Sequence, residues 1–244
     1  MDKILISGAS SGLGLEICKK LSEDYYIICF SRKIELLKKY FDKKKNIEFY
    51  ELDLTNLIKS EKFIKKIYEK HKNISILINN AAQIDNKPME KLNIKKASNI
   101  FKLNVLAPAL FMKYFIKNIN FKKDYGRIVN ITSGAPLNCF PNYSLYSSSK
   151  SALNSISITA AKEVNKNITI NLLSPGPIKT KMTSGMKAKF FSMDQCISDI
   201  KKLISKKNDI NGKFIWRGKI IPLLPNLKDI NWLKGEASKK YKKI

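Results

Sequence analysis

The sequence predicts a doubly wound α/β fold, in which helices cover both faces of a parallel β-sheet. Short apolar runs alternate along the chain with longer amphipathic stretches, a pattern typical of βαβ units. A glycine-rich turn, Ser7–Gly14, follows the first apolar run and opens the first amphipathic stretch. The length of 244 residues suits one domain, 1–244, with a polar and basic tail at 228–244 that we expect to fray.

The individual elements follow from the spacing of apolar residues. Six strands are expected at Lys3–Ser7, Tyr26–Phe30, Ile47–Leu52, Ile74–Ile78, Arg127–Ile131 and Ile168–Leu173. Helices are expected at Leu13–Leu21, Leu36–Phe41, Leu57–Tyr68, Ala97–Ile116 and Tyr146–Val164. The segment Pro177–Met193 interrupts the alternation and is predicted to be a loop with short helices.

The formal net charge of +26 raises the question of a nucleic-acid partner. Only three of the 46 basic residues are arginines (Arg32, Arg127 and Arg217), and the lysines are spread along the whole chain. Specific phosphate and base recognition favours arginine. A general bias in residue usage therefore explains the charge better than nucleic-acid binding, with an anionic substrate or an acidic partner as the alternative.

Several classes of protein are excluded or disfavoured by composition. No apolar run approaches the roughly 18 residues of a membrane span, and the N-terminus lacks the pattern of a signal peptide, so we expect a cytoplasmic protein. The four cysteines have no metal-ligand spacing and are expected to be buried. The only histidine, His71, lies in a Lys-rich stretch and is expected at the surface, which counts against Ser-His-Asp chemistry. We predict no metal site.

The glycine-rich turn is the first candidate site. At a strand–turn–helix junction, glycines permit close approach of the backbone to a pyrophosphate, and the helix N-terminus supplies free N–H groups. The turn is thus predicted to bind a dinucleotide through Gly8, Ser10, Ser11, Gly12, Leu13 and Gly14.

The end of the second expected strand bears on which dinucleotide binds. NAD-binding folds commonly place an acidic residue there, about 20 residues past the glycines, for the ribose 2′-hydroxyl. Here the chain reads Ser31-Arg32-Lys33, and a guanidinium can bind a 2′-phosphate. We therefore expect NADP(H) rather than NAD(H). Asp53 and Leu54, after the third strand, are predicted to contact the adenine, although Asp53 could instead cap the helix near Asn56.

A second candidate site is formed by Tyr146 and Lys150, which are four residues apart on one expected helix face. A free tyrosine has a pKa near ~10, and a nearby ammonium lowers it. Ser133 ends the fifth expected strand, at the sheet edge where ligands bind. These residues are predicted to converge on one carbonyl group.

Together these features resemble the short-chain dehydrogenase/reductase family along nearly the whole chain. The matching positions are the turn at Ser7–Gly14, Asp53, Asn79-Asn80-Ala81, Asn104, Ser133, Tyr146, Lys150, and Pro175-Gly176 with Thr180. The resemblance implies a Rossmann-like domain with about seven parallel strands. It also implies hydride transfer between NAD(P)(H) and an alcohol or carbonyl, in a homodimer or homotetramer.

The resemblance also implies a role for each matching residue. Tyr146 would be the general acid, Ser133 would polarise the carbonyl, and Lys150 would bind the nicotinamide ribose and lower the pKa of Tyr146. Asn104 would hold a water that links Lys150 to solvent. Around the cofactor, the resemblance adds Asn79, Asn80, Ala81, Pro175, Gly176, Ile178 and Thr180.

Three features depart from the family pattern. Ser7 replaces threonine, and Ala82 replaces the glycine that usually follows Asn-Asn-Ala. Asn211–Ile215 resembles the family's last strand, but the following Trp216–Lys219 and the tail from Ile220 do not match its usual end, which puts the usual oligomer contacts in doubt.

The substrate is less defined than the reaction. Pro177–Met193 and Gly134–Ser144 are expected to line an apolar pocket through Leu137, Phe140, Tyr143, Met182, Met186, Phe190 and Phe191. Such a pocket suits ketones, acyl chains as in 3-oxoacyl-carrier-protein reductases, or sugars. A non-catalytic NADP(H)-binding regulator, a nucleic-acid-associated protein, and a dehydratase or epimerase remain as alternatives.

Overall fold

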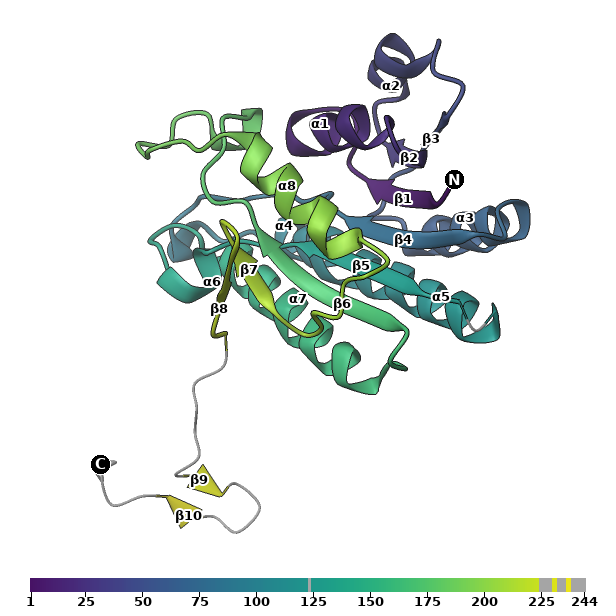
Figure 1. Ribbon diagram of the computed structural model, residues 1–244. Helices are drawn as coiled ribbons and strands as arrows, with labels where there is room; N and C mark the ends of the chain where they lie inside the picture. Colours follow the sequence, from purple (N-terminus) through teal and green to yellow (C-terminus); the bar gives the residue numbers. More distant parts are fainter. Residues whose placement is uncertain (123, 224–229, 232–235, 238–244) are drawn as a thin grey trace.

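The computed structural model describes residues 1–122, 124–223, 230–231 and 236–237. Its centre is an eight-stranded sheet in the order β3-β2-β1-β4-β5-β6-β7-β8, shown in Figure 1. The strands are β1 Lys3–Ser7, β2 Tyr26–Ser31, β3 Ile47–Glu51, β4 Ile74–Asn79, β5 Gly126–Ile131, β6 Ile168–Ser174, β7 Phe214–Trp216 and β8 Lys219–Ile221. Strands β1 to β7 are parallel, which confirms the doubly wound α/β prediction.

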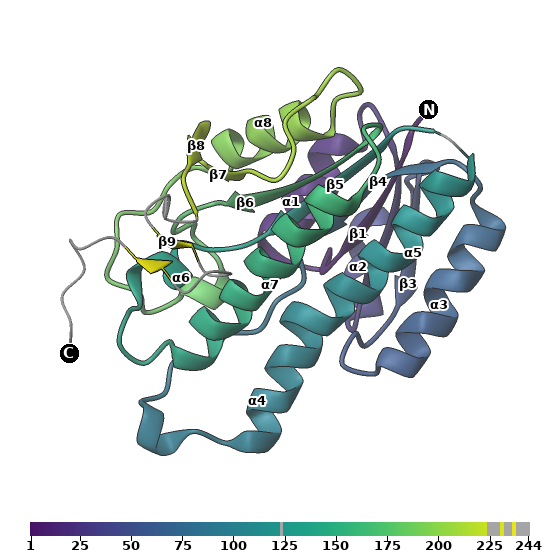
Figure 2. The ribbon, with the colours of Figure 1, turned by 90° about the horizontal axis from the view of Figure 1, so that it is seen from below.

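Helices cover both faces of the sheet, giving three layers (Figures 1 and 2). One face carries α1 (Gly12–Leu21), α2 (Ile34–Phe41) and α8 (Met193–Ile204); the other carries α3 (Leu57–Lys70), α5 (Ala107–Lys122) and α7 (Ser144–Glu163). The shorter helices are η1 (Met89–Lys91), α4 (Ile94–Phe101), η2 (Lys102–Leu106), α6 (Ala135–Asn138) and η3 (Lys181–Thr183).

The strand residues alternate between two cores, one under each helical layer. In β1, Ile4 and Ile6 pack toward α1 and α8, whereas Leu5 packs toward α3 and α5. In β4, Ile76 and Leu77 divide in the same way. Because successive side chains of a strand point to opposite faces, a sheet covered on both sides needs these continuous apolar runs, and they are what the sequence shows.

Some boundaries and elements differ from the prediction. The long helix expected at Ala97–Ile116 consists of α4, the π-helical turn η2 and α5, because the hydrogen-bond pattern widens at 102–106 without breaking the helical path. Helix α8, which follows the predicted loop Pro177–Met193, was not expected.

An eighth strand is the largest departure from the expected sheet. Strand β8 pairs antiparallel with β7 through a two-residue turn, Arg217-Gly218. Both turn residues have positive φ, 50° and 74°, the conformation that suits a tight hairpin. The predicted tail 228–244 lies outside the described residues, apart from the short strands β9 (Ile230–Asn231) and β10 (Glu236–Ala237).

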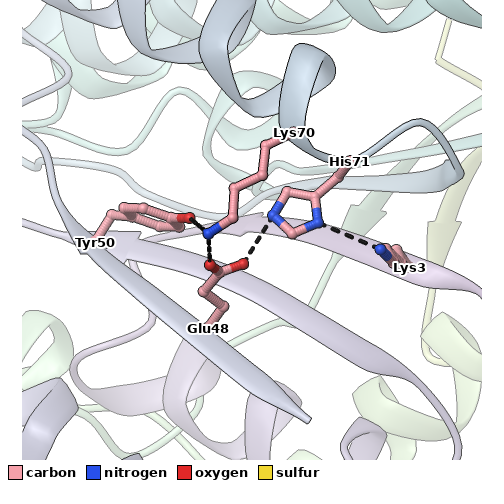
Figure 3. A network of polar contacts seen from close by, with 5 residues as sticks. All are labelled: Lys3, Glu48, Tyr50, Lys70 and His71. Atoms are coloured by element: carbon pink, nitrogen blue, oxygen red, sulfur yellow. Dashed lines mark hydrogen bonds and ion pairs between the residues drawn. The ribbon is translucent and has the colours of Figure 1, made fainter.

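The expectation that His71 lies at the surface is wrong. It is 5% exposed and belongs to a polar network at the amino-terminal edge of the sheet (Figure 3). Its Nε2 lies 2.7 Å from Glu48 Oε2, and its Nδ1 lies 3.3 Å from Lys3 Nζ. Lys70 contacts both Glu48 and the Tyr50 hydroxyl. Folding thus brings together residues from β1, β3 and the end of α3.

This network predicts a pH dependence of stability. Burial lowers the pKa of His71 and outweighs the opposing effect of Glu48. The folded protein therefore binds a proton less readily than the unfolded chain, and stability falls as pH drops through the unfolded pKa of about 6.5. We expect His71→Gln to lose less thermal stability than the natural protein between pH 7.5 and 5.5, measured by calorimetry. An equal loss in both proteins would show that His71 does not contribute.

Three of the four cysteines lie where composition predicts them. Cys18, Cys29 and Cys196 are buried as expected, but Cys139 is exposed in a left-handed conformation that ends α6. Across the residues that the structure describes, no helix combines the length and apolar character that crossing a bilayer requires.

Candidate active site

A cavity of about 840 Å³ runs along the carboxyl-terminal edge of the sheet. All the predicted site residues line it except Asn79, Asp53 and Asn104; Asn79 is buried in β4 and donates a 2.7 Å hydrogen bond to Asn130. The lining set comprises Gly8, Ser10, Ser11, Gly12, Leu13, Gly14, Ser31, Arg32, Leu54, Asn80, Ala81, Ser133, Tyr146, Lys150, Pro175, Gly176, Ile178 and Thr180. Most of these residues lie at or after the ends of β1 to β6, as expected for the ligand crevice of an open α/β sheet; Tyr146 and Lys150 lie on α7.

The glycine turn requires glycine at two of its positions. Gly8 has a φ of +73°, and a Cβ there would lie 2.8 Å from Ala81 Cα. A Cβ on Gly14 would lie 2.3 Å from the Gly8 carbonyl oxygen. The first turn of α1 can thus pack closely beneath the loop, and any larger residue would displace the backbone.

The β4 loop secures this turn through hydrogen bonds. The Ser7 hydroxyl accepts bonds from the backbone N–H groups of Asn80 and Ala81, each at 3.0 Å. The Asn80 side-chain amide donates to the carbonyl oxygens of Ser7 and Gly8 at 3.1 and 3.2 Å. Ser7 therefore keeps, through its hydroxyl, the hydrogen bonds that a threonine could make to the β4 loop. The Asn80 side chain in turn binds the backbone of the glycine turn.

The N-terminus of α1 faces the cavity without a side-chain cap. Its N-cap residue, Ser11, makes no capping hydrogen bond, so it leaves first-turn N–H donors for a ligand. Gly12, Leu13 and Gly14 of that turn line the cavity. Uncapped donors and a positive helix end fit a pyrophosphate group.

The adjoining end of the cavity is polar and positively charged. Ser31 donates a hydrogen bond to Ser10 at 2.7 Å and accepts one from the Lys33 backbone at 3.2 Å. Arg32 and Lys33 are exposed and line the same end. The cation Lys33 was not among the predicted site residues, although it follows Arg32 directly.

Ser133, Tyr146 and Lys150 all line the cavity, and the Tyr146 hydroxyl interacts with the Ser133 side chain. Tyr146 and Lys150 stand one turn apart on α7, and the Lys150 ammonium lies 5.9 Å from the Tyr146 ring centre. Lys150 is 2% exposed and donates a 2.8 Å hydrogen bond to the Ile131 carbonyl. Ser133 follows β5, and its hydroxyl also accepts a bond from the Ala135 N–H at 3.1 Å.

The protonation properties differ from the predicted ones in one respect. Burial raises the pKa of Tyr146 above its ordinary value, and interaction with the Ser133 hydroxyl only partly offsets this. The predicted lowering by Lys150 is therefore not found. Burial also lowers the pKa of Lys150 to about 7, because the charged form is costly away from water. Near neutral pH, Tyr146 is a proton donor and Lys150 lies close to its midpoint.

Asn104 lies behind the cavity wall, fully buried within the π-helical turn η2. Its side chain exchanges two 2.9 Å hydrogen bonds with the Gln83 backbone and donates a third, at 3.0 Å, to Ser149. Single π-turns inside helices often occur at functional sites. Here the turn directs Asn104 toward α7, where it contacts Ser149, the residue directly before Lys150.

Asp53 does not line the cavity, although its neighbours Leu52 and Leu54 do. Its carboxylate accepts hydrogen bonds from the Thr55 N–H and hydroxyl at 2.9 and 2.8 Å. The alternative role of helix cap is wrong, because Asn56 caps α3 by accepting a bond from the Lys59 N–H.

The loop that follows β6 packs against the far side of the glycine turn. A Cβ on Gly12 would lie 3.2 Å from the Thr180 side chain, so the loop after β6 touches the start of α1. Thr180 and Thr183 form a reciprocal capping box around η3. Gly176 has a φ of +70° and lies against Phe191 and Trp216.

The predicted substrate wall is present in part. Leu137, Phe140, Tyr143, Met182 and Met186 line the cavity, as expected. Phe190 and Phe191 do not line it. Phe191 instead packs beneath the guanidinium of Arg217, 4.1 Å from ring centre to Cζ.

Three apolar residues of the β7–β8 hairpin complete the wall and were not predicted: Phe214, Trp216 and Ile221. The sequence did contain a signal for this hairpin. Apolar residues at Phe214 and Trp216 are followed by Arg217-Gly218, and a glycine at this place favours the positive φ of a tight hairpin turn.

Family comparisons agree with this geometry. The family model described as short chain dehydrogenase matches residues 2–189. The chain is 36% identical over 189 residues to the 3-oxoacyl-acyl-carrier-protein reductase of Buchnera aphidicola subsp. Schizaphis graminum, covering 75% of each protein. It is 28% identical over 183 residues to the L-xylulose reductase of Caenorhabditis elegans, covering 74% of this chain and 73% of the relative.

Solved structures give the same fold. A 4-hydroxyisoleucine dehydrogenase complexed with NADH has a TM-score of 0.82 and 27% identity, over 88% of this chain and 96% of that one. ElxO with NADP bound has a TM-score of 0.78 and 27% identity, with the same two coverages. The chain therefore belongs to the short-chain dehydrogenase/reductase family, as an oxidoreductase that uses NAD(P)(H) on the alcohol or carbonyl group of a small molecule.

Proposed function

We propose that this enzyme reduces ketones that carry an apolar group, with NADPH as the hydride donor and Tyr146 as the proton donor. The observation that carries the proposal is the meeting of Ser133, Tyr146 and Lys150 in one cavity between the uncapped helix α1 and an apolar wall. This arrangement can hold a dinucleotide at one end and a carbonyl compound at the other.

Within this proposal the residues have separate tasks. Ser133 donates a hydrogen bond to the substrate carbonyl and polarises it. Tyr146, which keeps its proton at neutral pH because burial raises its pKa, transfers that proton to the forming alkoxide. The bound cofactor supplies the hydride to the carbonyl carbon.

Lys150 and Asn104 support the proton donor. Lys150, with a pKa of about 7, can take or give a proton near Tyr146 while its hydrogen bond to Ile131 holds it in place. Asn104 contacts Ser149, which lies on the same helix as Lys150. We propose that it stabilises the position of this part of α7 and holds water near Lys150.

The choice of NADP(H) depends on the charge at the end of β2. Arg32 and Lys33 line the cavity there, and two cations favour a ligand with an additional phosphate. The nearest carboxylate by sequence, Glu35, is exposed and pairs with Lys38. Asp53 interacts electrostatically with Arg32 but offsets only one of the two cations, so this end of the cavity stays positive.

Replacement of Arg32 tests the cofactor preference. We expect Arg32→Ala to lower kcat/KM for NADPH about 10- to 100-fold and to change that for NADH less than about 3-fold, since one charge-assisted phosphate contact is lost. Steady-state kinetics with both cofactors measure this. Lys44→Ala, at an exposed loop position, is the control and should change neither. A natural enzyme that prefers NADH would contradict the proposal.

The apolar wall bears on the substrate. Leu137, Phe140, Met182, Met186 and Trp216 offer apolar surface to the reacting centre. This supports ketones with an alkyl, acyl or aryl group, including the 3-oxoacyl class named for the Buchnera relative, over a sugar such as that named for the nematode relative.

A carbonyl panel tests the function as a whole. NADPH oxidation is followed at its absorbance band with acyl thioesters, aryl ketones, short diketones and ketoses. We expect turnover, with apolar ketones preferred; turnover confined to ketoses would contradict the substrate class. The same panel separates a reductase from a regulator or an epimerase, neither of which consumes NADPH. The predicted homodimer or homotetramer stays a prediction, which light scattering of the purified protein would check.

A further inference from the structure

We infer that Trp216, presented by the β7–β8 hairpin, is the residue that selects an apolar substrate over a hydrophilic one. The inference rests on the proposed function and names the part of this chain that sets its specificity. Trp216 and Ile221 line the same cavity as Tyr146 and Ser133.

Strand register places the apolar residues of the hairpin on one face. In the antiparallel pair, Phe214 faces Ile221 and Trp216 faces Lys219. Because side chains two apart and directly paired residues share a face, Phe214, Trp216, Ile221 and Lys219 are directed to the same side. The three apolar residues line the cavity, whereas Lys219 is exposed and does not. The intervening Ile215 is buried in the opposite core, beneath α8.

Sheet order places this face at the substrate end. Along the carboxyl edge, the cavity residues follow β2 (Ser31), β1 (the glycine turn), β5 (Ser133) and then β7 (Trp216). A dinucleotide that extends from Ser31 across the glycine turn to the catalytic residues therefore leaves the β7–β8 end for the substrate. Figure 1 shows β7 and β8 beyond β6, on the side away from β1.

The hairpin is fixed to its surroundings, so Trp216 has a defined position. Asp199 of α8, 3% exposed, accepts a 2.9 Å hydrogen bond from the Gly218 N–H and another at 2.9 Å from Gln195. Arg217 stacks on Phe191. A Cβ added to Gly176 would lie 3.3 Å from Trp216 Nε1, so the indole also lies against the loop that follows β6.

A large aromatic wall of this kind has a chemical preference. An indole offers the greatest apolar area of any side chain and pairs well with flat or aliphatic groups. A hydroxylated substrate would lose hydrogen bonds to water on entering, and the indole N–H of Trp216 is the one polar side-chain group that Phe214, Trp216 and Ile221 offer to replace them. Ketones with an aryl or alkyl group are therefore favoured.

The test compares acetophenone with hydroxyacetone, both reduced with NADPH. We expect the natural enzyme to favour acetophenone in kcat/KM by at least about 10-fold. Trp216→Ala should lower kcat/KM for acetophenone about 30-fold and that for hydroxyacetone less than about 3-fold, in line with the discrimination that apolar pockets achieve. Trp216→Phe, which keeps an aromatic ring, should retain most of the preference. NADPH binding, followed by its fluorescence, should be unchanged and confirms that each variant is folded.

Ile220→Ala is the matched control, because Ile220 belongs to the same hairpin but is 53% exposed and does not line the cavity. It should behave like the natural enzyme. The inference is overturned if Trp216→Ala keeps the natural ratio between the two ketones, or if Ile220→Ala changes that ratio as strongly.

A binding measurement separates this inference from the proposed function. Titration of 1-phenylethanol into the enzyme–NADPH complex forms a dead-end complex and needs no turnover. Weaker binding to Trp216→Ala, by about 10-fold or more, supports the role of Trp216 even if neither ketone is reduced, whereas unchanged binding overturns it. Absence of reduction by the natural enzyme contradicts the proposed function alone.

Discussion

Tyr146→Phe is expected to lower kcat/KM for ketone reduction about 1,000-fold while it leaves the affinity for NADPH unchanged. The hydroxyl is the only group removed, and the ring stays at a position where the tyrosine is 8% exposed. General acid catalysis of this kind is worth roughly 10²- to 10⁴-fold. Pre-steady-state kinetics should show that the loss lies in the chemical step.

Tyr143→Phe is a suitable control for this substitution. Tyr143 also lines the cavity, and its ring centre lies 6.5 Å from that of Tyr146, so the two variants remove the same atom from neighbouring positions. We expect Tyr143→Phe to retain activity within about 10-fold. Full activity of Tyr146→Phe, or an equal loss in both variants, would refute the assignment of Tyr146.

Lys150→Met is expected to lose most activity and to gain stability at neutral pH. In the folded protein, burial lowers the pKa of Lys150 from 10.5 to about 7. The unfolded chain therefore holds the proton more tightly, and the stability of the natural enzyme rises with pH between about 7 and 10.5. Below pH 7 the whole cost of burying the charge is present.

The stability gained by Lys150→Met should depend on pH over the same range, from about 7 to 10.5. Each unit of pKa corresponds to about 1.4 kcal/mol, and the substitution also removes the hydrogen bond to Ile131. We expect a net gain on the order of 1–3 kcal/mol at pH 7, shrinking toward pH 10, measured by urea unfolding at several pH values. Lys162→Met, an exposed position on the same helix, should show no such trend. A gain that does not change with pH would contradict the titration of Lys150.

The elements that depend on local sequence patterns lie where the sequence predicts them. The apolar runs of β1 to β6 and the glycine turn could be located because each depends on neighbouring residues: a continuous apolar run in a strand covered on both faces, or a positive φ at Gly8. The same holds for Tyr146 and Lys150, whose four-residue spacing becomes one helix face.

What the sequence misplaced depends on contacts between distant segments. His71 is buried because β1, β3 and α3 bring Lys3, Glu48 and Lys70 to it. Asp53 follows the expected strand but its carboxylate turns to Thr55 instead of the cavity. Trp216 reaches the cavity because β7 pairs with β6, far away in sequence, and the Arg217-Gly218 turn ends the strand directly after it.

The upward shift of the Tyr146 pKa also depends on contacts between distant segments. A lysine one helical turn away predicts a lower pKa, but the fold buries both groups, and burial raises the pKa of the phenol more than the Ser133 hydroxyl lowers it. The cost of desolvation depends on the whole surrounding structure, which residue spacing alone does not contain.

The most direct measurement follows the transferred hydride, in the natural enzyme and in the variant that lacks the Tyr146 hydroxyl. The natural enzyme is incubated with acetophenone and NADPH deuterated at the transferable position, and the 1-phenylethanol formed is examined by mass spectrometry. We predict one deuterium at the carbinol carbon, and almost none of this product with Tyr146→Phe at equal NADPH occupancy. NADPH binding by the natural enzyme without transfer of deuterium to acetophenone or to any other ketone of the panel would contradict the account.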